Sequence, residues 1–134
     1  MFLQPKNLKF KKLKKGKIAK FKYKSNKLQY GFIGLKAIES GMISSKQIES
    51  SRQAIMRRIK RKGKLWIRIY PNVPVTKKPL EVRMGKGKGS VSYYSSKISG
   101  GVVLFEICGV NKHTAVSAFK TGSAKLPLKT KIIF

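Results

Sequence analysis

Residues 44–70 read SSKQIESSRQAIMRRIKRKGKLWIRIY, and this stretch decides the fold class because a helical pattern passes directly into a strand pattern. Ser44 and Gln47 have the S-x-x-Q spacing of a capping box, in which two side chains satisfy each other's backbone amides at the start of a helix. The apolar side chains that follow recur at helical spacing, at Ile48, Ile55 and Ile59. Because glycine commonly follows the end of a helix, the pattern predicts a helix over residues 44–62 that ends at Gly63.

The strand pattern covers residues 64–70, where apolar side chains alternate with larger polar and aromatic ones. One face of this strand would carry Leu65, Ile67 and Ile69, and the other Trp66, Arg68 and Tyr70. The sequence leaves two interpretations of Trp66 and Tyr70, which are packing beneath the helices or stacking on nucleic-acid bases. Packing in the core is the favoured interpretation.

The remaining elements are predicted from the flanking patterns. A strand is predicted at residues 28–38, and the prolines that follow residue 70 predict an extended loop. Residues 91–98 and 102–108 are predicted to pair as two strands across a Ser-Gly-Gly turn. Asn111 is expected to cap a second helix, and a last strand is expected over residues 126–133. The simplest α+β packing of these elements has two helices on one face of a mostly antiparallel sheet.

Net charge is the strongest functional signal. The 134 residues contain 32 lysines and arginines against 4 acids, for a formal net charge of +28. So few carboxylates cannot neutralise the cations, and a compact fold would repel itself unless a polyanion lay close. Phosphate backbones are the commonest such partner. Arg57, Arg58 and Arg61 lie in a run of five cations in six residues. That is more charge than a helix dipole attracts, so we interpret them as RNA contacts.

The first 27 residues carry eleven lysines, no acid and thinly spread apolar side chains. The lysines are spaced too evenly for an amphipathic helix, so the pattern predicts an extended basic arm over residues 1–27 that gains order on a phosphate surface. A single domain is expected over residues 28–134. A solubilising tail is the alternative for the arm, but the interleaved Phe10, Phe21 and Tyr23 argue against it.

A Gly/Lys-rich loop is the most specific local motif. Arg83-Met84-Gly85-Lys86-Gly87-Lys88-Gly89 places three glycines in alternation, which lets the backbone approach a ligand and expose its amides. The spacing fits neither a P-loop nor a dinucleotide-binding fingerprint. Because the loop also carries three cations, we expect it to meet a phosphate-rich surface. The alternative is a glycine loop that is merely flexible.

The sequence offers no residue set for catalysis or metal binding. Cys108 and His113 are too few for a zinc site, and Glu81 and Glu106 are expected to pair with surplus lysines rather than act as acid and base. One histidine and no aspartate leave no ordinary catalytic triad. We therefore expect no enzyme activity, no cofactor and no small-molecule substrate. No uncharged stretch exceeds eight residues, so no membrane insertion is expected.

Three other classes of function are alternatives to a specific RNA-binding protein. A protein that coats or compacts nucleic acid fits the composition, but it has little need of a folded core with a strand such as residues 64–70. A cationic membrane-active protein needs a long helix with one wide apolar face, which the sequence lacks. An RNA-processing enzyme ranks last because no catalytic set is present.

A series of motifs covers essentially the whole chain in a fixed order. The motifs are Leu3–Lys6, Gly34–Ala37, Gln47–Glu49 with Arg52 and Ala54, Gly63–Arg68, Pro74–Leu80, Arg83–Gly89 and Ala124–Thr130. In this order, and above all in the pairing of GKLWIR with KPLEVRMGKGKG, the chain resembles the bacterial-type large-subunit ribosomal protein family called L-sixteen.

The resemblance implies an α+β sandwich and a structural role in the large ribosomal subunit. Members of this family bind ribosomal RNA near the central protuberance and contact tRNA near the aminoacyl and peptidyl sites and the peptidyl-transferase region, beside neighbouring ribosomal proteins. Carried over by position, residues 83–89 are the tRNA-proximal loop. The same resemblance assigns arm contacts to Lys6, Lys9, Lys11 and Lys12. Lys14 and Lys15 of the same arm complete the predicted rRNA contacts.

The resemblance also bears on the compartment. The family pattern begins at the initiator methionine, which leaves no room for a transit peptide. Rich usage of lysine and isoleucine, with extreme basicity, resembles organelle-encoded members. We therefore expect a ribosome of the mitochondrial matrix, with a plastid or a bacterial cytoplasm as the alternatives.

Overall fold

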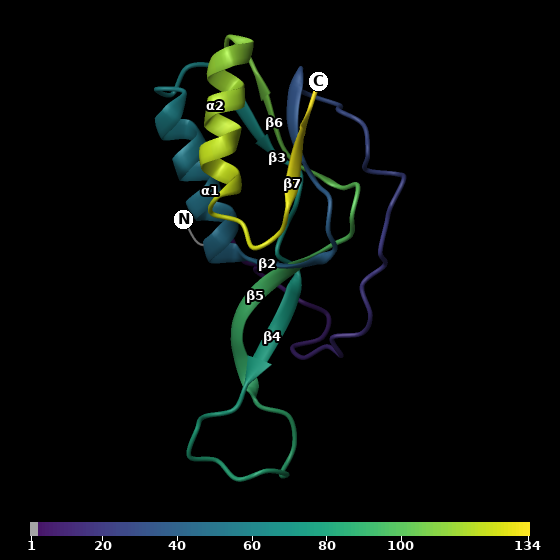
Figure 1. Cartoon of the computed structure of the whole chain (residues 1–134). Helices are drawn as coiled ribbons and strands as arrows, with labels where there is room; N and C mark the ends of the chain where they lie inside the picture. The colour runs from purple at the N-terminus through teal and green to yellow at the C-terminus, as the bar shows by residue number, and fades with distance from the viewer. Residues whose placement is uncertain (1–2) are drawn as a thin grey trace.

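Two helices and a four-stranded antiparallel sheet form the main layers of the computed structural model, which describes residues 3–134 (Figure 1). The strand order in this sheet is β3-β6-β1-β7, and the strands are β3 (Lys64–Ile67), β6 (Val103–Cys108), β1 (Ile33–Ala37) and β7 (Thr130–Ile133). Helices α1 (Ser45–Arg58) and α2 (Lys112–Ser123) lie side by side on one face (Figure 1). The predicted α+β class is confirmed.

A second antiparallel sheet extends away from the helices. Its order is β2-β5-β4, with β2 (Gly41–Ser44), β5 (Ser90–Ile98) and β4 (Val73–Lys77). Strands β4 and β5 form a ribbon that carries a wide loop, residues 78–89, at its far end (Figure 1). The ribbon therefore holds the Gly/Lys-rich loop well away from the two helices.

Both helices begin at the caps that the sequence predicts. Ser44 Oγ accepts a hydrogen bond from the Gln47 amide at 3.3 Å, and Gln47 Oε1 accepts one from the Ser44 amide at 2.9 Å, so the capping box is complete. At α2, Asn111 Oδ1 accepts from the His113 amide at 3.3 Å. These side chains satisfy amides that have no partner inside the helix.

The two helices approach closely because a glycine lies at their contact. A Cβ atom added to Gly122 of α2 would lie 2.5 Å from Ile55 Cγ1 of α1, so no larger residue fits without displacing the helices. Ser51 Oγ of α1 donates to the Gly122 carbonyl oxygen at 2.9 Å across the same contact. Phe105 and Phe119 lie beneath this contact region in the same core cluster and are fully buried. Each contributes about 1.5–3 kcal/mol through burial.

Helix α1 ends four residues earlier than the sequence pattern predicts. The Lys60 amide donates to the Arg57 carbonyl oxygen at 3.2 Å, and the Arg61 amide donates to the Met56 carbonyl oxygen at 3.1 Å. This pair of bonds is a Schellman motif, which terminates a helix with a residue in the left-handed conformation. Lys60 occupies that position with φ 52° although it is not glycine. The prediction of a helix that runs to residue 62 is therefore wrong.

The predicted pairing of residues 91–98 with residues 102–108 is also wrong. Strand β5 pairs with β2 and β4, whereas β6 pairs with β1 and β3. The intervening Ser99-Gly100-Gly101 does form a turn, in which the Val102 amide donates to the Ser99 carbonyl oxygen at 3.4 Å, but the Gly101 amide donates to the Ala37 carbonyl oxygen at 2.8 Å and the flanking strands do not pair with each other. This segment therefore connects β5 of one sheet to β6 of the other.

Two strands of the second sheet were not predicted. Residues 73–77 were expected to be an extended loop because of their prolines, but they form β4 with Pro74 inside it. Proline is tolerated there because β4 is an edge strand, where one row of amides needs no partner. Residues 41–44, which follow a predicted chain break at Gly41, form β2.

The predicted strand over residues 28–38 is shorter, because its first residues wrap around a buried carboxylate. Glu106 has no exposed surface, and its carboxylate accepts hydrogen bonds from the amides of Tyr30 at 2.7 Å, Gly31 at 2.9 Å and Gln29 at 3.2 Å. The Arg68 guanidinium completes the group with an ion pair. The expectation that Glu106 pairs with a surplus lysine is therefore wrong. The planar fork of arginine suits a buried carboxylate better.

Burial and hydrogen bonding act on the Glu106 carboxyl in opposite directions. Removal from water acts to raise its pKa, whereas the hydrogen bonds from Tyr30, Gly31, Arg68 and Gln29 lower it. The hydrogen bonds prevail, and the pKa lies below the ordinary value. Glu106 is therefore charged at neutral pH and attaches residues 29–31 to the outer face of the sheet.

Candidate nucleic-acid interface

The described part of the basic arm, residues 3–27, is attached to the fold by backbone hydrogen bonds. The Lys22 amide donates to the Gly100 carbonyl oxygen at 3.0 Å, and the Gly100 amide donates to the Lys20 carbonyl oxygen at 2.9 Å. The Val103 amide donates to the Ser25 carbonyl oxygen at 3.0 Å. No helix or named strand lies in this part of the arm, as expected for an extended segment. The first two residues of the expected arm lie outside the described residues.

The arm meets the base of the Gly/Lys-rich loop. Lys12 Nζ donates to the Lys88 carbonyl oxygen at 2.7 Å, and Lys88 Nζ donates to the Leu13 carbonyl oxygen at 2.6 Å. These two reciprocal bonds join segments that are 75 residues apart in the sequence. The lysines of the arm and the cations of the loop therefore share one surface, which we call the arm–loop surface.

The loop itself is open and has the backbone conformation that its glycines permit. Gly85 and Gly87 have φ angles of 94° and 87°, and a Cβ atom added to either would meet nothing within 4 Å. Arg83, Lys86 and Lys88 are exposed, and Met84 is 97% exposed. Lys78 Nζ bonds the Gly85 carbonyl oxygen across the loop. The loop thus exposes its cations and its backbone at the far end of the β4–β5 ribbon.

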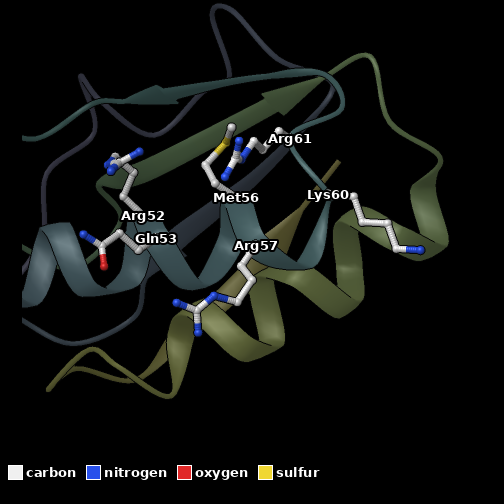
Figure 2. Close-up of a pocket in the computed structure, with 6 residues that line it drawn as sticks. All are labelled: Arg52, Gln53, Met56, Arg57, Lys60 and Arg61. Atoms are coloured by element: carbon white, nitrogen blue, oxygen red, sulfur yellow. The ribbon is translucent and has the colours of Figure 1, made fainter.

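A second cationic surface follows α1. A cavity of about 540 Å³ is lined by Arg52, Gln53, Met56, Arg57, Lys60 and Arg61. Figure 2 shows these side chains spread along α1 and the turn that follows it. We call this set the α1 stripe. It brings the predicted contacts Arg57 and Arg61 together. The third, Arg58, turns towards α2, where its Nε donates to Ser117 Oγ at 3.1 Å.

Sequence reasoning missed Arg52 of the α1 stripe, whereas Lys60 lies in the run of five cations that the sequence singles out. The signal was present, because residues 52, 56 and 60 repeat at a spacing of four, as do residues 53, 57 and 61. Arg52 also forms an ion pair with Glu49 at 2.6 Å. The hydrogen bond from Arg52 is the main cause that lowers the pKa of Glu49 to about 2. This pair fixes the Arg52 side chain at one end of the stripe.

Three of the four glutamates form ion pairs away from the arm and the loop. In the described residues the ion pairs are Glu49 with Arg52, Glu106 with Arg68, and Glu39 with Lys129. Glu81, which was expected to pair with a lysine, is exposed in the loop and forms no ion pair within residues 3–134. No cation of the arm or of residues 83–89 forms an ion pair in the same part of the chain, so positive charge prevails on the arm–loop surface, with Glu81 as the one carboxylate of the loop.

The favoured interpretation of Trp66 and Tyr70 as core residues is wrong. Leu65 and Ile67 pack against the core, so the alternating side chains of β3 face away from it. Trp66 is half-buried and stacks on Tyr30, with ring centroids 6.0 Å apart, and Tyr70 is exposed. Trp66 therefore lies on the outer face of the sheet, and Tyr70, which follows the end of β3, lies outside the core.

Among residues 3–134, no three histidine, cysteine, aspartate or glutamate side chains gather into a possible metal site. Cys108 is half-buried and His113 is exposed. The part of the chain that the structure describes has no helix long and apolar enough to cross a membrane.

The fold and its surfaces define a basic α+β protein of the nucleic-acid-binding class, with one cationic stripe on a helix and one cationic surface on a loop and an arm. Comparison with known proteins identifies the family. Residues 5–133 match the model of the ribosomal protein L16p/L10e family. The chain belongs to this family, and it is a ribosomal protein rather than an enzyme.

Individual relatives are similar over nearly their whole length. The large ribosomal subunit protein uL16 of Blochmanniella pennsylvanica is 53% identical over 133 residues, which cover 99% of this chain and 98% of that protein. Its counterpart in Buchnera aphidicola is 53% identical over 131 residues, with 98% and 96% covered. The counterpart in Acinetobacter baylyi is 49% identical over 131 residues, with the same coverage.

These relatives correct one expectation. All three are bacterial proteins, so the preference for a mitochondrial copy is not supported. Residue usage and extreme basicity favoured the organelle, and such composition does not distinguish an organelle from a bacterium. A ribosome in a bacterial cytoplasm, the alternative named above, agrees with the relatives.

Proposed function

We propose that this protein is built into the large ribosomal subunit, where it binds ribosomal RNA near the central protuberance and helps to position tRNA. Its relatives carry the name of a large-subunit protein. The single observation that carries the proposal is the arm–loop surface, because Lys12 and Lys88 join two segments whose cations form no ion pair with a carboxylate in residues 3–134. Neighbouring ribosomal proteins are the other expected contacts.

The contacts with rRNA are assigned to the arm and to α1. Six lysines of the arm and the arginines at positions 57, 58 and 61 supply charge that phosphates neutralise. Extended arms suit this task, because a chain without its own core can follow an irregular RNA surface. The α1 stripe adds a cavity in which Arg57 and Arg61 can hold phosphate oxygens in bidentate fashion.

Contact with tRNA is assigned to the loop of residues 83–89. The β4–β5 ribbon carries this loop away from the body of the fold (Figure 1), so the arm and helix can bind rRNA while the loop reaches another molecule. The exposed amides near Gly85 and Gly87 and the cations at residues 83, 86 and 88 suit a phosphate backbone. RNA, not this protein, would perform the chemistry of peptide transfer.

Fractionation of the source lysate on a sucrose gradient tests the ribosomal assignment. We expect the chain only in large-subunit and whole-ribosome fractions, and we expect it to stay there through a moderate salt wash. A chain that sediments with DNA would instead favour the alternative of a protein that coats nucleic acid.

Salt dependence tests the electrostatic contacts. Ten phosphate contacts would give a slope of log affinity against log salt of about −7 to −9, and replacing Arg57 and Arg61 by alanine should reduce its magnitude by about 1.5–2. Lys120→Ala on the exposed side of α2 is the control. A slope that is flat in the wild type would contradict the electrostatic account.

A loop variant tests the assignment to tRNA. Replacing Arg83, Lys86 and Lys88 by alanine should leave folding intact, because all three are exposed and outside the core. We expect slower tRNA accommodation or incomplete subunits. The control removes the same charge elsewhere, at Lys120, Lys125 and Lys131. Normal elongation with the loop variant would remove the assignment.

A further inference from the structure

A ladder of aromatic and cationic side chains lies on the outer face of the four-stranded sheet, away from the helices. The rings of Tyr30 and Trp66 stack with an interplanar angle of 20° and centroids 6.0 Å apart. Lys64 Nζ lies 5.2 Å from the Trp66 ring centroid, and Arg68 Cζ lies 5.4 Å from the Tyr30 ring centroid. Two nearly parallel rings are therefore flanked by two cations.

The ladder is held in place by buried contacts. The Tyr30 amide and the Arg68 guanidinium both bind the buried Glu106 carboxylate, so one fixed group orients the backbone of one ring and the cation beside it. Rings set in this way lose little conformational entropy when a ligand stacks on them. The ladder is therefore preorganised for binding a ligand.

The ladder is also open to solvent. Tyr30 is 58% exposed although its ring contacts both Trp66 and Arg68, and the nearby Phe32 is 76% exposed. Other aromatic rings of the chain, Phe105 and Phe119, are fully buried in the core, whereas the rings of Tyr30 and Phe32 stay uncovered. An aromatic side chain that is fixed but uncovered indicates a ligand with a flat apolar face.

We propose that Tyr30 and Trp66 form a stacking platform for an unpaired RNA base, with Lys64 and Arg68 attracting the phosphates on either side. The proposal rests on the proposed function, because it takes RNA to be the partner, and it adds a contact that recognises bases rather than phosphates. Aromatic rings accept any base, since every base has a π-face. The flanking cations favour an RNA strand over an apolar protein segment, which has no charge to meet them.

The single tryptophan makes the platform measurable. Trp66 is the only tryptophan in the chain, so quenching of its fluorescence reports directly on a base that stacks at this site. The probes are a short oligoadenylate and an abasic strand of the same length and charge. Both offer phosphates, but only the oligoadenylate offers bases.

We expect oligoadenylate to quench Trp66 fluorescence and the abasic strand to bind without quenching. Tyr30→Leu should weaken oligoadenylate binding about five- to hundredfold, the range for loss of one stacked base, and should leave binding of the abasic strand unchanged. Tyr30→Phe keeps the ring and should bind as the wild type does, which separates stacking from the phenolic hydroxyl. Tyr93→Leu is the matched control, because Tyr93 is an exposed tyrosine of β5, in the other sheet and outside the ladder.

The outcomes separate this proposal from the function on which it rests. If both strands bind with equal affinity and strong salt dependence, RNA binding stands and the platform is overturned. The same holds if Tyr30→Leu behaves as Tyr93→Leu does while circular dichroism shows Tyr30→Leu to be folded. If neither strand binds the wild-type protein, both proposals fail.

Discussion

Replacing Glu106 by glutamine tests the contact that attaches residues 29–31 to the sheet. The buried carboxylate accepts amide hydrogen bonds from Tyr30 at 2.7 Å and from Gly31 at 2.9 Å, and it pairs with Arg68. Glutamine has nearly the same volume, so the substitution leaves packing intact. It removes the negative charge and turns one acceptor oxygen into an NH2 group, which has no acceptor among these donors.

The size of the effect follows from the contacts that remain. Breaking a buried ion pair by removing one partner costs about 3–5 kcal/mol. Glutamine keeps one oxygen that can still accept an amide hydrogen bond, worth about 0.5–1.5 kcal/mol. The Arg68 side chain is 14% exposed, so water can reach it once its partner is neutral. We therefore expect a loss of about 2–4 kcal/mol in the free energy of unfolding.

Urea unfolding at pH 7 measures this loss. With an m-value of about 1.5 kcal/mol/M, the midpoint should fall by about 1–3 M. Since the folded-state pKa of Glu106 is lowered, the difference between wild type and variant should be full above the ordinary glutamate pKa and shrink as the pH falls below it. Glu39→Gln, which removes an exposed ion pair with Lys129, is the control and should cost less than about 1 kcal/mol. A loss below about 1 kcal/mol for Glu106→Gln at pH 7, with an unchanged m-value, would refute the reasoning.

Three further changes have expected outcomes. Glu49→Gln should cost less than about 1 kcal/mol at pH 7, because Arg52 is partly exposed. The folded-state pKa of Glu49 is about 2. The advantage of the wild type in the free energy of unfolding should therefore be complete above the ordinary pKa of 4.5 and vanish towards pH 2, and a pH series of urea midpoints would detect this change. Lys60→Gly should stabilise the fold by about 1 kcal/mol, because it relieves the left-handed conformation at φ 52°; an equal gain from Lys62→Gly, which has no positive φ, would contradict that cause. Gly122→Ala should cost about 1–3 kcal/mol, because its Cβ would meet Ile55, and an unchanged thermal midpoint would show that the helices separate freely.

Local patterns predicted the elements whose causes are local. The capping box at Ser44 and the Asn111 cap are formed within a few residues, so the sequence pattern alone located both helix starts. The end of α1 was misplaced because glycine was expected to close it. Instead Lys60 takes the left-handed position, three residues before Gly63.

Strand partners could not be read in the same way. Alternation shows that a segment is a strand and which side chains share a face, but it carries no information about the neighbouring strand. Residues 91–98 and 102–108 looked like a hairpin for this reason, and the Ala37 contact at Gly101 separated them into two sheets. Trp66 was placed in the core because alternation shows that Trp66 and Arg68 share one face of the strand, but it does not show which face the helices cover.

The candidate interface likewise has parts that local sequence predicts and parts that depend on contacts between distant segments. The basic arm as a whole, the arginines near position 58 and the glycines of residues 83–89 could be chosen from charge density and spacing alone, whereas individual arm lysines were assigned by the family resemblance. The contact of Lys12 with Lys88 could not be predicted in this way. It joins residues 76 apart through a backbone carbonyl oxygen, and every residue has such an oxygen, so residue types do not indicate which one is used. The same holds for the amides of residues 29–31 around Glu106.

By itself, the sequence determined the charge, the α+β class, the two helix starts and the composition of the loop, since each depends on residue type or on neighbours within one helical turn. Only the tertiary structure decided which strands pair, which face Trp66 occupies, how the arm joins the loop, and where the carboxylates are used. These depend on which distant segments can bury apolar surface together while their backbone polar groups stay bonded, and that condition applies to the whole chain at once.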